Sequence, residues 1–217
     1  DLIMDEEITI IDNKTRNEKI VNFFVNNKKL IIYVISATLI VLISFYSFKI
    51  YKDGQRQQMS DKYNSAIINF KNTDKSQTVN LLKEIIENKD ATYSPLALYF
   101  LIDNNLINNK EKINDLFNIL IDHTSLETEI KNLIIYKKAL YNSDTSKENE
   151  LLEILNPLFN SQSIWKSHGL YLLAEYFYSK NEKQKAKEFF NQIITAQNAN
   201  QDIILEAQKR LSRDLSD

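Results

Sequence analysis

Nineteen consecutive residues without a charge, Leu30 to Phe48, constrain this chain more than any other feature. An α-helix rises 1.5 Å per residue, so the run would measure about 28 Å, close to the hydrocarbon thickness of a bilayer. Core helices of soluble proteins seldom stay uncharged over such a length. The run therefore predicts a transmembrane helix.

Basic residues stand at both ends of the run. Lys28 and Lys29 directly precede Leu30, and Lys49 directly follows Phe48. Lysine side chains at the ends of a span can extend to the lipid headgroups while the backbone stays in the apolar layer. We therefore predict that these five residues flank a membrane anchor.

A cleaved signal peptide would also contain an apolar run near an N-terminus. This run begins about 30 residues into the sequence and is longer than the apolar core of a usual signal peptide. It is followed by Lys49-Ile50-Tyr51-Lys52 instead of the small residues of a cleavage site. We therefore expect an uncleaved signal anchor.

The charges around the run decide little about its orientation. Within about 16 residues, five Lys or Arg precede the run and four follow it, whereas orientation follows a clear cytoplasmic excess. A short head with a large translocated domain behind the anchor is the commoner arrangement, so we expect the N-terminus inside. The predicted parts are a cytoplasmic head at 1–29, the span at 30–48, a juxtamembrane linker at 49–59 and a folded domain at 60–217.

Residues that turn the chain are scarce, with two glycines and two prolines in 217 residues. Sandwiches and barrels need many tight turns, so they are poor candidates for this sequence. The composition is 43% hydrophobic and 26% charged, which is ordinary for a folded domain and argues against disorder. We predict an all-α fold.

From residue 60 onward, apolar residues recur at intervals of three and four, the period of an amphipathic helix. The segments pair, and successive pairs begin 31 to 38 residues apart, which is typical of helical-hairpin repeats. The predicted pairs are 60–71 with 76–88, 94–108 with 110–121, 125–141 with 147–159 and 163–179 with 182–197, followed by a single helix at 201–213. Their predicted starts are marked by Ser94 before Pro95, by Thr124 with Glu127, by Thr145 with Glu148, and by Asn109 and Asn181.

The fourth pair carries the clearest repeat pattern. Small Ala174 and Ala186 would let its two helices approach closely, and Phe177 and Phe190 would fill the space beside that contact. This spacing resembles a tetratricopeptide repeat. In the last helix, polar Gln208 stands where a close-packing alanine is usual, as the end of a solenoid requires. We predict a tetratricopeptide-like helical-hairpin solenoid with a C-terminal capping helix.

Residues for catalysis or metal binding do not form a recognisable pattern. The chain has no cysteine, its two histidines lie about 45 residues apart, and its two glycines are more than a hundred residues apart. Thiolate sites, a multi-histidine metal site and a phosphate-binding loop are therefore not expected. The net charge is -2 and no basic stripe stands out, which disfavours nucleic acid. We predict a chain that is not an enzyme and that has no cofactor or metal.

The first helix of the fourth pair is rich in aromatic residues. Helical spacing predicts that most of them pack in the core or between repeats. Trp165 and Tyr178 have a second interpretation, in which they line a groove formed by the first helices of the stack. Such grooves bind extended or helical peptides. Both interpretations stay open for these two residues.

The whole layout resembles the YfgM-like ancillary subunits of the bacterial SecYEG translocon. Those proteins have a short head, one signal-anchor helix and a compact, divergent tetratricopeptide domain. The segment Asp90–Ala97, at the entry to the second predicted pair, is similar to the turn of that family into the same helix. The resemblance covers nearly the whole chain, but it supplies no functional motif that could be carried onto particular residues.

The resemblance implies a location in the bacterial inner membrane, with the repeats in the periplasm. It also implies protein partners, namely the SecYEG translocon and a membrane-anchored PpiD-like chaperone at the translocon exit. We therefore expect a membrane-tethered protein-binding scaffold. The alternative is a structural scaffold in another cell-envelope assembly, such as cell division or outer-membrane biogenesis.

Overall fold

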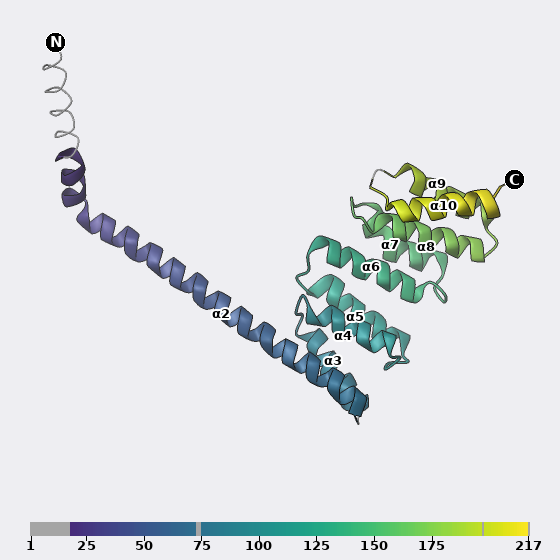
Figure 1. Ribbon diagram of the computed structural model, residues 1–217, viewed down its shortest axis with the longest axis horizontal. Coiled ribbons are helices and arrows are strands. Elements are labelled where there is room, and N and C mark those ends of the chain that lie inside the picture. The colour runs from purple at the N-terminus through teal and green to yellow at the C-terminus, as the bar shows by residue number, and fades with distance from the viewer. Residues whose placement is uncertain (1–17, 73–74, 197, 217) are drawn as a thin grey trace, which may run out of the picture. The chain divides into compact units, whose positions relative to one another are not determined.

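A computed structural model of the chain describes residues 18–72, 75–196 and 198–216, and within these ranges the only regular structure is α-helix (Figure 1). This confirms the predicted all-α class for the described residues. The chain divides into two compact units, Asp1–Gln57 and Gln58–Asp217. Residues 1–17, more than half of the predicted head, lie outside the described residues.

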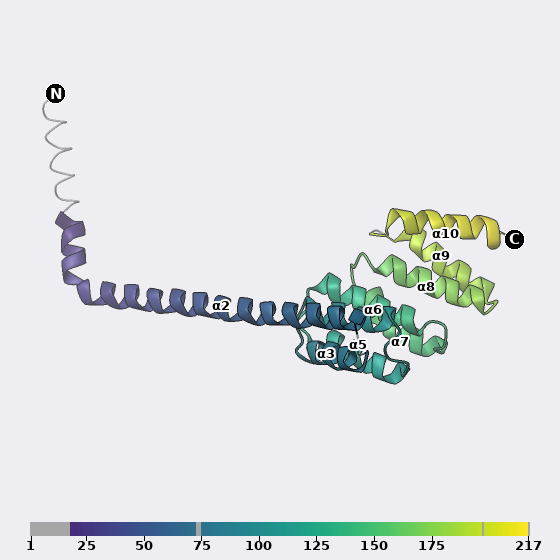
Figure 2. The same ribbon diagram turned by 60° about the horizontal axis from the view of Figure 1, so that its bottom comes forward.

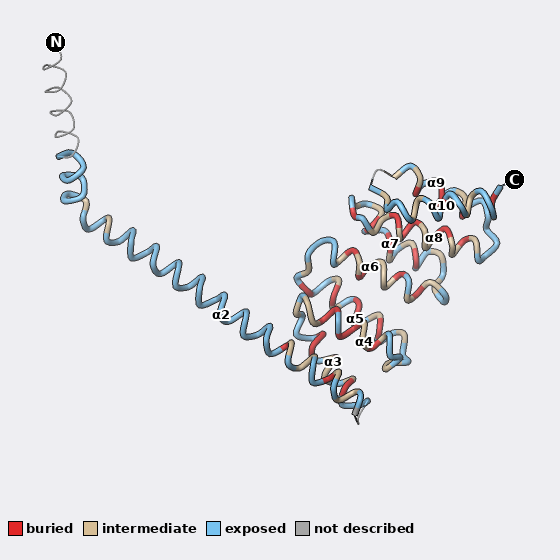
Figure 3. The backbone as a smooth tube through the Cα atoms, in the orientation of Figure 1, coloured by how far each residue is buried: buried red, intermediate tan, exposed pale blue. Residues whose placement is uncertain are grey.

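Helix α2 runs unbroken over Lys28–Asn72, after a shorter helical segment at 18–26. In the N-terminal unit the apolar residues of this helix are exposed, apart from half-buried Ile31 (Figure 3); Tyr33 is 73% exposed and Phe45 is 69% exposed. A helix on the surface of a soluble domain would instead have one polar and one apolar face. Among the described residues, this is the one helix that is long and apolar enough to cross a membrane.

The predicted linker at 49–59 is not a separate segment, because α2 continues through it. Its sequence contains no proline, and its lysine, glutamine and arginine residues favour helix. Gly54 is the one residue there with poor helical preference. A Cβ at this position would have no heavy atom within 4 Å, so no close packing requires glycine here.

Eight further helices follow α2 in the described part of the C-terminal unit, and each overlaps a helix predicted from the sequence. The largest differences are at α4, which ends five residues early, and at α6 and α8, which each begin three residues late. The helices are α3 (Lys75–Glu87), α4 (Tyr93–Asp103), α5 (Lys110–His123), α6 (Thr128–Asn142), α7 (Glu148–Phe159), α8 (Lys166–Ser179), α9 (Lys183–Thr195) and α10 (Gln201–Asp214).

Two asparagines in the left-handed conformation end α4 and α8. Asn105 has φ 49° and Asn181 has φ 61°. The N–H of the residue after each asparagine donates a hydrogen bond to a carbonyl in the last turn of the helix. Leu106 donates to Leu101 of α4 and Glu182 donates to Phe177 of α8, both at 2.9 Å. This is the pattern of a Schellman motif, in which asparagine is one of the few residues that tolerate positive φ. Asn181 therefore terminates α8, and its predicted role as a cap ahead of α9 is wrong.

Two threonines that were predicted to start helices instead close the preceding ones. The Thr124 hydroxyl donates to the Ile119 carbonyl at 3.1 Å, and Thr124 is the C-cap of α5. The Thr145 hydroxyl donates to the Asn142 carbonyl at 3.5 Å. In a short interhelical loop, a hydroxyl can cap either neighbouring helix, and here carbonyls near the end of the earlier helix are within its reach.

The actual helix starts use other side chains. Asn109, as predicted, caps α5 by accepting a hydrogen bond from the Lys112 N–H at 2.8 Å. At α7, the Glu150 carboxylate accepts from the Lys147 N–H at 3.2 Å. The carboxylate lies in the first turn, where it also meets the positive end of the helix dipole.

Each helix from α3 to α10 packs against the next one along the chain, most extensively α8 against α9 (Figures 1 and 2). Contacts between α3 and α5, α6 and α8, and α8 and α10 join alternate helices. Helices α3, α5, α6, α8 and α10 are therefore held by neighbours both one and two places away in the sequence. The unit depends mainly on contacts that are local in the chain.

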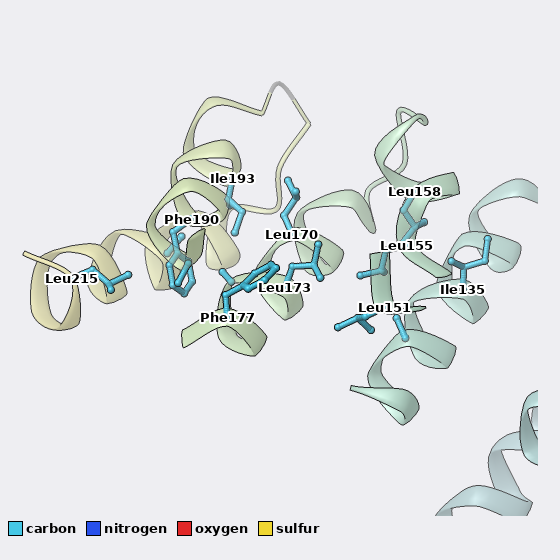
Figure 4. Packing of buried hydrophobic residues seen from close by; sticks show 14 residues of the cluster. Ile135, Leu151, Leu155, Leu158, Leu170, Leu173, Phe177, Phe190, Ile193 and Leu215 are labelled. Carbon is cyan, nitrogen blue, oxygen red and sulfur yellow. The ribbon is translucent and has the colours of Figure 1, made fainter. Parts of the chain in front are cut away.

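The C-terminal unit has two clusters of buried apolar side chains. One extends from the end of α2 to α6, and the other extends from α6 to α10 (Figure 4). The adjacent residues Ile134 and Ile135 of α6 belong one to each cluster. Helix α6 therefore joins the two cores. Burying one such side chain stabilises a fold by about 1.5–3 kcal/mol.

Packing in the last predicted pair confirms the expected burial of its small and aromatic residues. Ala174, Ala186 and Phe190 are fully buried, and Phe177 is 1% exposed. Gly169 adds a close approach between α7 and α8 that the sequence did not predict. A Cβ at this position would lie 3.2 Å from a Leu155 methyl carbon, which is tighter than ordinary contact.

We expect Ala186→Leu to destabilise the C-terminal unit by about 1–3 kcal/mol, because the added methyl groups would overpack a site that has no free space. Gln192→Leu on the exposed side of α9 is the matched control and should change stability by less than about 0.5 kcal/mol. Urea unfolding followed by circular dichroism measures both. Equal unfolding midpoints for the two variants would show that Ala186 does not occupy a close contact.

Candidate peptide-binding groove

The five predicted membrane flanks all lie on α2 and are exposed. Lys28 and Lys29 begin the helix, just before Leu30. At the other end of the uncharged run, the Phe48 ring lies 5.4 Å from the Lys52 ammonium, one turn further along. The C-terminal flank thus consists of an aromatic ring beside cationic groups, the combination that prefers a membrane interface.

Trp165 and Tyr178 lie at opposite ends of α8, thirteen residues or about 20 Å apart along the helix. The Trp165 ring stacks on Tyr136 of α6 at 5.9 Å. The Tyr178 ring lies 4.3 Å from the guanidinium of Arg210 on α10. The structure therefore does not bring the two predicted residues together, and each is half-buried by neighbours from its own chain.

A groove of about 400 Å³ lies instead between α4 and α6. Its walls are mainly apolar, and two of the wall residues are unusually exposed for their type, Leu96 at 41% and Ile130 at 40%. Exposed apolar side chains gathered in a concavity are typical of a protein or ligand contact. The groove is lined by Ala91, Thr92, Pro95, Leu96, Tyr99, Leu126, Glu127, Ile130 and Leu133.

The start of α4 presents one wall of this groove. The Asp90 carboxylate accepts hydrogen bonds from the N–H groups of Thr92 at 2.9 Å and Tyr93 at 2.7 Å. These bonds satisfy donors that have no partner within the helix, and Pro95 in the same first turn has no N–H to satisfy. The backbone donors at the start of α4 are therefore satisfied, although few side chains of the helix itself are polar.

Helix α4 is apolar on two sides, and this is the signal that could have located the groove in the sequence. Ala97, Leu98 and Leu101 are fully buried in the core that extends from α2 to α6. Leu96 and Tyr99 belong to the other side and line the groove. A helix that had only the core to cover would carry polar residues at these last two positions.

Opposite charges stand at the two ends of the groove. The Glu127 carboxylate belongs to the lining at the start of α6. Ten residues further along α6, the Lys137 ammonium lies 4.2 Å from the centroid of the ring of Tyr99, which lines the groove. Burial raises the pKa of the Tyr99 phenol to about 12, so this ring is neutral at physiological pH.

A second cleft, of about 450 Å³, lies between α5, α6 and α7 and is polar. Asn114 and Asn142 exchange two amide hydrogen bonds in it, at 3.0 and 2.8 Å. The Lys138 ammonium donates to the Asn118 side-chain oxygen at 2.7 Å. Burial lowers the pKa of Lys138, although the nearby carboxylate of Asp122 opposes this change. The polar groups at the base of this cleft are largely paired with one another.

The described residues contain no group of three or more His, Asp or Glu that could hold a metal ion. His123 lies in the last turn of α5 and is exposed. His168 packs against Trp165 with ring centroids 4.9 Å apart, and burial lowers the pKa of its imidazole. The two histidines therefore occupy different helices and different surroundings.

Helix α10 is held on α8 by a group of charges. The Arg210 guanidinium binds both carboxylate oxygens of Glu175, at 2.6 and 2.7 Å, and also binds Asp214. Arg213 donates to Asp214 at 2.8 Å. Hydrogen bonds from Arg213 and then Arg210 lower the pKa of Asp214 to about 2. Ionic contacts between Arg210 and Glu175 thus join the last helix to α8.

We expect the contribution of Asp214 to stability to disappear in acid. Its folded pKa lies below the ordinary value of 3.8, so the ionised form stabilises the fold above about pH 4 and this stabilisation is lost as the pH falls toward 2. The urea midpoints of the wild type and Asp214→Asn should therefore differ at pH 6 and converge by pH 2. A constant difference between the two proteins over that range would contradict the assignment.

Comparison of the chain with protein-family models, with curated proteins and with solved structures found no match. The similarity to YfgM-like translocon subunits therefore depends on the layout of the chain and on the segment Asp90–Ala97.

Proposed function

We propose that this chain is a membrane-anchored scaffold whose C-terminal unit binds other polypeptides. The observation that carries the proposal is the uncharged run Leu30–Phe48, which forms a continuous helix and is exposed throughout except for half-buried Ile31. So much contiguous apolar surface is not stable in water. A helix satisfies its own backbone hydrogen bonds, so it can be transferred whole into a bilayer.

Helix order and packing support a helical-hairpin solenoid for the C-terminal unit. Successive helices contact each other, and α6 contacts α8 as α8 contacts α10. Ala174 and Ala186 are fully buried, as is expected of the positions where the helices of a tetratricopeptide repeat come closest. In this arrangement α10 is the capping helix, and its exposed residues are polar apart from Leu205.

Binding is the activity that the surfaces support best. The groove between α4 and α6 offers apolar walls of a kind that recognises polypeptide segments. A domain that acts by binding alone gains from an anchor, because the tether raises its effective concentration near partners in the same membrane. This supports the scaffold function over catalysis.

The family resemblance gives the proposal its specific form. We propose an ancillary subunit of the bacterial translocon, with residues 1–29 in the cytoplasm and the helical unit in the periplasm. There it would assist a PpiD-like chaperone or its clients at the translocon exit. The support for this form is the order of head, anchor and helical hairpins along the chain.

A reporter fused after Asp217 tests the orientation. An enzyme that is active only outside the cytoplasm should be active in this fusion. In the proposed topology, residues 1–29 stay in the cytoplasm and the single span takes everything after it to the other side of the membrane. The protein should remain in the membrane fraction after carbonate washing. A fusion that is active with a cytoplasmic reporter instead would reverse the proposed topology.

Co-purification in mild detergent tests the partner. The full chain should retain translocon subunits, whereas the soluble fragment Gln58–Asp217 should fold as a helical protein but retain them far less, because it has lost the anchor. A chimera with an unrelated span in place of Leu30–Phe48 should retain them if the anchor is only a tether. Recovery of cell-division or outer-membrane assembly proteins in place of the translocon would favour the alternative scaffold.

A further inference from the structure

We infer that the groove between α4 and α6 selects apolar polypeptide segments that carry a cationic residue at one end and an acidic residue at the other. This inference rests on the proposed polypeptide-binding function and specifies its ligand class. It combines three observations on the same surface: the apolar walls, the Glu127 carboxylate and the Lys137 ammonium.

The walls of the groove select apolar side chains. Leu96 from α4 and Ile130 from α6 remain about 40% exposed, while the core side of α4 is fully buried. An incoming apolar side chain would remove both residues from water without disturbing the core. Removal of this surface from water is the main favourable term in such binding.

The charges of Glu127 and Lys137 select the residues at the two ends of the apolar segment of the ligand. Glu127 and Lys137 are ten residues apart on or beside α6, which corresponds to about 15 Å along the helix. An extended chain advances about 3.3 Å per residue, so four or five residues span that distance. A ligand with opposite charges at this spacing can place each charge beside its complement while its apolar residues cover the walls.

Both charges are available to a ligand. Neither Glu127 nor Lys137 forms an ion pair with any residue that the structure describes. The Lys137 ammonium rests on the face of the Tyr99 ring, which holds it at the groove but leaves its N–H groups free to donate. A carboxylate that reaches Lys137 would form a charge-assisted hydrogen bond.

Three blocked peptides with the same four apolar residues test the selection: one flanked by Arg and Glu, one by two Glu and one by two Arg. The mixed peptide is made in both charge orders, because the groove orders the charges but not the chain direction. Binding to the full chain in nanodiscs is followed by fluorescence anisotropy. We expect the better mixed peptide to bind about two- to five-fold more tightly than either like-charged peptide, the range of one exposed ion pair.

Reversing the charge at either end of the groove should change which peptide binds most tightly, while peptide binding itself remains. Lys137→Glu should favour the peptide with two Arg, and Glu127→Lys should favour the peptide with two Glu. Ile130→Asp should weaken all the peptides. Lys183→Glu, which makes the same charge change at an exposed position of α9, should keep the wild-type ranking. Because a transferred preference requires bound peptide, a folding defect cannot imitate it.

The outcomes separate this inference from the proposed scaffold function. One peptide ranking shared by the wild type and both groove variants would overturn the inference, even if translocon subunits still co-purify. Absence of binding by every peptide to the wild type would overturn it as well. A transferred preference together with loss of all co-purified partners would support the groove and contradict the scaffold function.

Discussion

An uncharged helix that is apolar on every side can leave water in only two ways, by entering a protein core or by entering a bilayer. In the N-terminal unit, the helix between Leu30 and Phe48 has no core around it. If the bilayer supplies the missing environment, the C-terminal unit need not cover this surface. Its own apolar residues are then free to form two cores and a groove.

The C-terminal unit is built from contacts between helices that are close in sequence, and small residues let some of these helices approach closely. Gly169 allows a close approach of α8 to α7, because a Cβ at this position would lie only 3.2 Å from a Leu155 methyl carbon. Ala174 and Ala186 are fully buried on α8 and α9. Helix α6 then connects the two cores through Ile134 and Ile135, so a change there would reach both halves of the unit.

The positions of the helices followed from apolar periodicity, but their ends were harder to predict. Thr124 and Thr145 stand in short loops where a hydroxyl can serve either neighbouring helix, and the choice depends on which backbone groups it can reach. The groove was missed for a related reason. Aromatic content drew the prediction to Trp165 and Tyr178, whereas the informative feature was α4, which is apolar beyond what its core side needs. Which apolar side faces the core depends on neighbouring helices that a single sequence does not locate.

A groove of about 400 Å³ accommodates few side chains, and this limits how tightly it can bind alone. Each apolar side chain that it buries contributes about 1.5–3 kcal/mol, and much of that gain is offset by the cost of ordering an extended segment. Micromolar affinity already requires about 8 kcal/mol of net binding free energy, which so small a contact does not readily supply. A tether to the membrane of the partner raises the effective concentration of the groove near that partner, provided that its geometry lets both sites be engaged at once. In the proposed function, weak selection by two flanking charges would decide among ligands that the anchor has already brought near, which gives a physical reason for the anchor and the groove to belong to the same chain.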